Sequence, residues 1–156
     1  MTEKRMRVFF LPALIAAMLL FGASAGAEDA ERHFETINGN EMTLQKWFDQ
    51  VSPGEKAGCR LGDSLAFPGF AVGDVFDGKT GYDLVIDLCG KTLTLAEPLV
   101  GPSSGDALYF GYGNKVVIRN GTILAGAKAA AVIRSKSDLT LTDVRVGNGE
   151  RAYSET

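Results

Sequence analysis

The sequence contains one histidine, two cysteines and one tryptophan among its 156 residues, and aromatic residues make up only 9% of it. A single histidine excludes His-rich metal sites and leaves His33 as the one candidate for histidine-dependent catalysis. The formal net charge of −3 gives the chain no general attraction to nucleic acid, so we expect no nucleic-acid partner. The few aromatic residues and the 19 glycines are typical of a turn-rich β protein.

Long hydrophobic runs are also missing. The apolar run from Val8 to Phe21 is shorter than the roughly 20 residues that cross a bilayer as a helix. Basic residues precede this run and the small residues 23–27 follow it, which is the pattern of a secretory signal peptide. We expect cleavage after Ala27 or Ala25 and a periplasmic or secreted mature chain without a membrane span. An uncleaved N-terminal anchor is the alternative.

Export bears on the two cysteines, Cys59 and Cys89. In an oxidising compartment a disulfide between them can persist, and we predict this bridge. The alternative is two separate, buried thiols that act as small hydrophobic side chains.

The expected mature chain begins with a polar leader at residues 28–42, which has no apolar pattern. A helix follows, because Leu44, Trp47, Phe48 and Val51 recur at helical spacing. Thr43 is the predicted N-cap of this helix. Trp47 and Phe48 are expected to be core residues.

Short β runs separated by glycine occupy the chain from Cys59 onward, and no amphipathic helix divides them. Three of the runs repeat, with starts 32 and 23 residues apart: Leu84–Asp87, Val116–Arg119 and Leu139–Thr142. A turn and a second short strand follow each run. The pattern predicts a solenoid of stacked parallel strands over residues 43–150, with a C-terminal tail at 151–156.

Two details set the expected register of the coils. The turns place Cys89, Asn120 and Asp143 at one equivalent position, where polar side chains of successive coils can stack. A third strand precedes two of the units and places Phe110 and Ile133 at equivalent positions.

The stretches LVIDLCGKTLTL, ALYFGYGNKVVIRNGTI and AAVIRSKSDLTLTDVRV resemble the coils of right-handed parallel β-helix proteins of the pectate-lyase-like superfold. The resemblance covers roughly residues 43–149. It implies an all-β fold, a short right-handed parallel β-helix that starts with an N-terminal capping helix. It implies no single activity, because that fold carries many functions.

Polysaccharide hydrolases of this superfold use clustered aspartates with a Gly-His-Gly segment, and its lyases use carboxylates for Ca²⁺ and a basic residue. Neither set is present here, so we expect no catalytic residues, no metal and no cofactor. Strand alternation instead places Tyr109 and Arg134 on an outer face, with Tyr112 and Lys136 nearby. Two tyrosines and two cations can stack on an acidic sugar and pair with it.

Three functions follow as hypotheses. The first is an exported, non-catalytic module that binds a polysaccharide or a cell-surface partner. The alternatives are the N-terminal part of a pectate-lyase-like polysaccharide-degrading enzyme and a fragment of an adhesin-type surface protein. In each case the last coil, with Leu139, Leu141, Val144 and Val146, lacks a visible cap, so we expect either end-to-end self-association or a tail that folds back only weakly.

Overall fold

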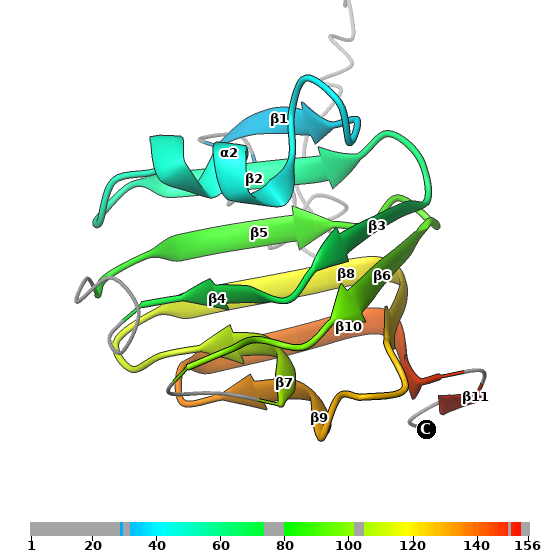
Figure 1. The fold of residues 1–156 in the computed structure, drawn as a ribbon. Coiled ribbons are helices and arrows are strands. Elements are labelled where there is room, and N and C mark those ends of the chain that lie inside the picture. Colours follow the sequence, from blue (N-terminus) through cyan, green and yellow to red (C-terminus); the bar gives the residue numbers. More distant parts are fainter. Residues whose placement is uncertain (1–28, 30–31, 74–79, 102–104, 150, 154–156) are drawn as a thin grey trace, which may run out of the picture. The chain divides into compact units, whose positions relative to one another are not determined.

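The structure, a computed structural model, describes residue 29 and residues 32–73, 80–101, 105–149 and 151–153. The expected signal peptide lies outside the described residues. From Arg32 onward the chain forms one compact unit, a parallel β-solenoid of about four turns with one short helix (Figure 1). The prediction of a parallel β-solenoid is confirmed. No helix among the described residues is long and apolar enough to cross a membrane.

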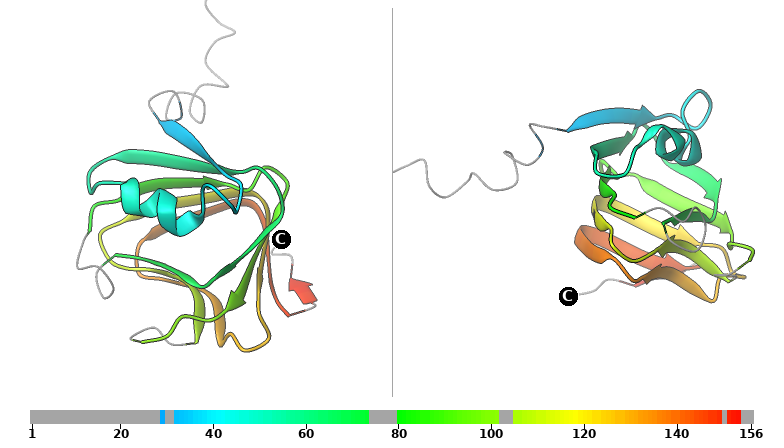
Figure 2. Two further views of the ribbon diagram at one scale, coloured as in Figure 1. Left: turned by 45° about the horizontal axis from the view of Figure 1, so that its top comes forward. Right: turned by 90° about the vertical axis from the view of Figure 1, so that its left-hand side faces the viewer.

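Three rows of parallel strands build the solenoid, and Figure 2 shows them from two further directions. The first row contains β1 (His33–Ile37), β2 (Lys56–Leu61), β5 (Asp83–Asp87) and the first halves of β8 (Lys115–Ala125) and β10 (Asp138–Asn148). The second row contains β3 (Leu65–Pro68), β6 (Thr92–Glu97) and the second halves of β8 and β10, with β11 (Arg151–Tyr153) pairing antiparallel to β10. The third row contains β4 (Phe70–Val72), β7 (Asp106–Phe110) and β9 (Ala131–Ser135).

The predicted repeat register is confirmed in the first row. Leu84 pairs with Val116, and Val116 pairs with Leu139. The turn residues Cys89, Asn120 and Asp143 have φ of 51°, 59° and 54°, and they are the only non-glycine residues with positive φ in the described part of the chain. This left-handed conformation bends each coil at the same place, and Asn and Asp adopt it more readily than most residues.

Inward side chains of successive coils stack into one apolar core. Val116, Ile118 and Ile123 of β8 are at most 1% exposed. The helix α2 (Leu44–Gln50) contributes to the same core, because Leu44, Trp47 and Phe48 are buried. The side chain of Thr43 accepts a hydrogen bond from the backbone N–H of Lys46 at 3.2 Å, which confirms the predicted N-cap.

Two expectations differ from the structure. Residues 33–37, which the composition assigned to a polar leader, form β1, pair with β2 and bury Ile37 completely. The solenoid therefore begins before Thr43. The sequence does not predict this first strand, because His33 and Glu35 interrupt any apolar alternation. In the third row Leu108, not Phe110, pairs with Ile133. This shift by two residues preserves which side chains face inward.

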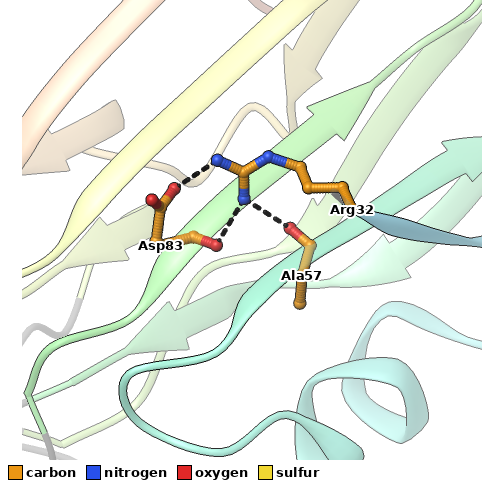
Figure 3. A network of polar contacts seen from close by, with 3 residues as sticks. All are labelled: Arg32, Ala57 and Asp83. Atoms are coloured by element: carbon orange, nitrogen blue, oxygen red, sulfur yellow. Dashed lines mark hydrogen bonds and ion pairs between the residues drawn. The ribbon is translucent and has the colours of Figure 1, made fainter. Parts of the chain in front are cut away.

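One buried side chain connects strands of three coils at the β1 end (Figure 3). The guanidinium of Arg32 donates to the backbone carbonyls of Ala57 at 3.3 Å and Asp83 at 2.8 Å, and to the Asp83 carboxylate at 2.6 Å. Its side chain is 2% exposed, and its Nε has no hydrogen-bond partner. Because a buried charge is costly unless it is paired, the Asp83 contacts are what make this burial tolerable.

Candidate functional site

The third row of strands gathers the four predicted ligand-binding residues, which we call the aromatic–cationic patch: Tyr109, Tyr112, Arg134 and Lys136. Tyr109 on β7 pairs with Arg134 on β9, so the two residues are direct neighbours across the sheet. The two other residues follow these strands in sequence, and the Lys136 backbone N–H donates to the Phe110 carbonyl at 2.7 Å. The structure therefore brings the predicted residues together.

The exposure of the two tyrosines differs from expectation. Tyr109 is only 1% exposed, whereas Tyr112 is 59% exposed. Tyr109 is absent from the apolar core cluster, in agreement with its predicted outward position, but its ring is covered and offers no surface for stacking. Within the patch, Tyr112 is the tyrosine that a ligand can reach.

Arg134 is held in place by a buried acid that the sequence did not reveal. Its Nε donates to Oδ2 of Asp106 at 2.7 Å, and the side chain of Asp106 is 3% exposed while that of Arg134 is 56% exposed. The hydrogen bond and the charge of Asp106 raise the pKa of Arg134 above its ordinary value. Asp106 therefore orients a guanidinium whose outer part remains in solvent.

Lys136 completes the patch by approaching both aromatic rings. Its Nζ lies 4.9 Å from the ring centroid of Tyr112 and 5.9 Å from that of Tyr109. Both distances are within the range of cation–π attraction. Two cations and one exposed ring consequently occupy one small region of the outer surface.

A second polar cluster surrounds Asp87, the last residue of β5 before the turn at Cys89. Its carboxylate, in a residue 7% exposed, accepts hydrogen bonds from the Cys89 backbone N–H at 3.0 Å, Asn120 Nδ2 at 3.2 Å and Arg119 Nε at 2.9 Å. Burial opposes ionisation, but these hydrogen bonds and the charge of Arg119 outweigh it and lower the pKa of Asp87. These bonds join Asp87 of β5 to Arg119 and Asn120 of β8, so the cluster ties two successive coils together.

The two cysteines are free in the structure, with Cys59 buried and Cys89 exposed. Burial raises the pKa of the Cys59 thiol, and the nearby Asp87 and Cys89 raise it further. Burial and the neighbouring Asp87 also raise the pKa of Cys89. These thiols therefore ionise with difficulty, and the predicted bridge between them stays a prediction.

Sequence reasoning found the members of the patch by strand alternation but missed Asp106. Asp106 stands alone at the start of a β run, directly after Gly105, and this pattern is typical of a turn rather than of a buried ion pair. Among the residues that the structure covers, no group of three or more His, Cys, Asp or Glu side chains could hold a metal ion. No family model, curated protein or solved structure matches the chain.

Proposed function

We propose that this chain is an exported β-solenoid module that binds an acidic polysaccharide through the aromatic–cationic patch. The observation that carries the proposal is the arrangement of Arg134, anchored by the buried Asp106 yet largely exposed, beside Lys136 and the exposed ring of Tyr112. In this proposal the fold is a right-handed β-helix of the pectate-lyase-like kind, and α2 closes its N-terminal end.

The chemistry of the patch favours a carboxylated sugar. A guanidinium binds a carboxylate through charge-assisted hydrogen bonds, and an exposed tyrosine ring offers a flat apolar face to the C–H face of a sugar ring. The chain as a whole is negatively charged, so it has no long-range attraction to a polyanion. Binding must therefore depend on these local cations.

Replacing Arg134 with glutamine is expected to weaken binding to polygalacturonate by about tenfold, because one charged hydrogen-bonding group is lost. Affinity electrophoresis and calorimetric titration with polygalacturonate measure the change. Since Arg134→Gln leaves Asp106 without its partner, Lys136→Gln provides a second variant that removes a cation without touching that ion pair.

The matched control is Arg145→Gln, which removes an exposed arginine from β10, outside the third row of strands. It should bind like the parent chain. Equal weakening by all three variants would point to general charge attraction, and absence of binding by the parent chain would reject the proposed function.

Export is the second part of the proposal, and it rests on the signal-peptide pattern of residues 1–27. Protein recovered from the exported fraction is expected to start at residue 28 or 26 and to contain a Cys59–Cys89 bridge. Intact mass after alkylation in denaturant without reductant tests both points, because denaturation makes the buried Cys59 accessible. Two added alkyl groups would show free thiols, and an uncut N-terminus would show that the segment is retained.

A further inference from the structure

The inward side chains of β10 are far less buried than their equivalents on β8. Leu141 pairs with Ile118, yet Leu141 is 38% exposed and Ile118 is 1% exposed. Leu139 and Val144 are likewise only partly buried against the core. The difference arises because β8 has a strand on both sides, whereas β10 is followed, among the described residues, only by the short β11.

The edge of β10 is open along most of its length. β11 pairs only with Val146–Asn148, so the stretch Asp138–Arg145 has no strand partner on this side among the described residues. Natural edge strands usually carry charge, proline or a bulge that prevents pairing. The segment Leu139–Thr142 (LTLT) contains no charge and no proline.

We propose that this edge pairs with the same edge of a second copy of the chain, antiparallel and around a two-fold axis at Thr140. The left-handed turn at Asp143 leaves Asp138–Thr142 as the straight part of the open edge. With Thr140 opposite its own counterpart, Leu139 lies opposite Leu141 of the other copy, and all four leucines face the core side. The pairing thus extends the sheet and covers the apolar side chains that β10 exposes.

Head-to-tail stacking on the other edge strand, β1, fits less well. The inward positions of β1 next to Ile37 are His33 and Glu35, which pair with Ala57 and Cys59 of the core. Their side chains are 83% and 39% exposed, and His33 Nε2 lies 2.8 Å from Glu35 Oε1. Stacking Leu139 and Leu141 on them would bury polar groups against apolar ones, which is unfavourable.

Light scattering and sedimentation over a range of concentrations test the association with the protein as it is recovered from cells. We expect a monomer–dimer equilibrium, and Leu141→Lys should weaken dimerisation by at least about tenfold because it places a charge between the paired leucines. The matched control is Val100→Lys, at an apolar residue that is 85% exposed and lies between β6 and β7. It should dimerise like the parent chain.

Cysteine crosslinking tests the register itself, in a Cys89→Ser background that leaves only the buried Cys59. Directly opposed residues of antiparallel strands have Cα atoms about 4.5–5.5 Å apart, within the range of a disulfide. Oxidised Thr140→Cys should therefore give about tenfold more covalent dimer than Thr142→Cys, whose two copies would lie about 13 Å apart along the strands.

The possible results separate clearly. A concentration-dependent dimer that Leu141→Lys weakens, with crosslinking at Thr140 and not at Thr142, supports the proposal. A strict monomer at all concentrations, growth into open-ended oligomers, or equal crosslinking at both positions overturns it. None of these results depends on the polysaccharide site, which lies on the third row of strands.

Discussion

Replacing Ile118 with aspartate is expected to lower the free energy of unfolding by about 4 kcal/mol, because it removes a packed side chain and puts an unpaired charge in the core. Ile118 is 1% exposed and lies between Ile86 and Leu141 of the neighbouring coils. Domains of this size are stable by only about 5–15 kcal/mol, so the melting temperature should fall by more than about 10 °C. Thermal denaturation followed by circular dichroism measures the loss.

The neighbouring residue provides the matched control. Val117 precedes Ile118 on β8, is outside the core cluster and is half-buried on the outer face. Val117→Asp adds the same charge to the same strand and should cost only about 1 kcal/mol. If the two variants melted at the same temperature, the assignment of inward and outward faces in β8 would be wrong.

Gly121→Ala is expected to cost about 3 kcal/mol through overpacking. A methyl group at this position would lie 2.5 Å from Cβ of Leu88 and 2.6 Å from the backbone carbonyl oxygen of Lys91. Both atoms belong to the preceding coil, and a backbone oxygen cannot move aside as a flexible side chain can. Urea denaturation gives the change in free energy directly.

Gly90→Ala separates this crowding from backbone strain. Gly90 has a φ of +75°, and a methyl group there would meet no atom within 4 Å. Its substitution should cost about 1 kcal/mol from the left-handed backbone alone. A loss at Gly121 no larger than the loss at Gly90 would show that the preceding coil yields to the added methyl group, and that the contact between coils does not require glycine there.

These turns show how far the sequence predicts the fold. The recurrence of Cys89, Asn120 and Asp143 after matching apolar runs was enough to align the coils, because a bend must recur at one place in every turn of a solenoid. The sequence around Gly121 does not predict that this position requires glycine. This requirement comes from the distance to the preceding coil, which the local sequence does not contain.

The candidate site was predictable to a similar degree. Alternation along β7 and β9 identified Tyr109 and Arg134 as neighbours on an outer face, since the period of a strand fixes the side of each residue. Burial of Tyr109 depends on what covers that face, including Lys136 from beyond the end of β9. Likewise, the pairing of Arg134 with Asp106 joins residues 28 positions apart, and no local pattern encodes it.

The hydrogen bonds of Arg32 to Ala57 and Asp83 affect how the β1 end of the solenoid unfolds. In most repeat proteins each repeat touches only its neighbours, so cooperativity follows a nearest-neighbour scheme and terminal repeats fray one at a time. Arg32, immediately before β1, instead reaches past β2 to Asp83 of β5. This contact is a next-nearest-neighbour coupling. Detaching β1 would break the ion pair between Arg32 and Asp83, so we expect β1, β2 and β5 to unfold as one unit.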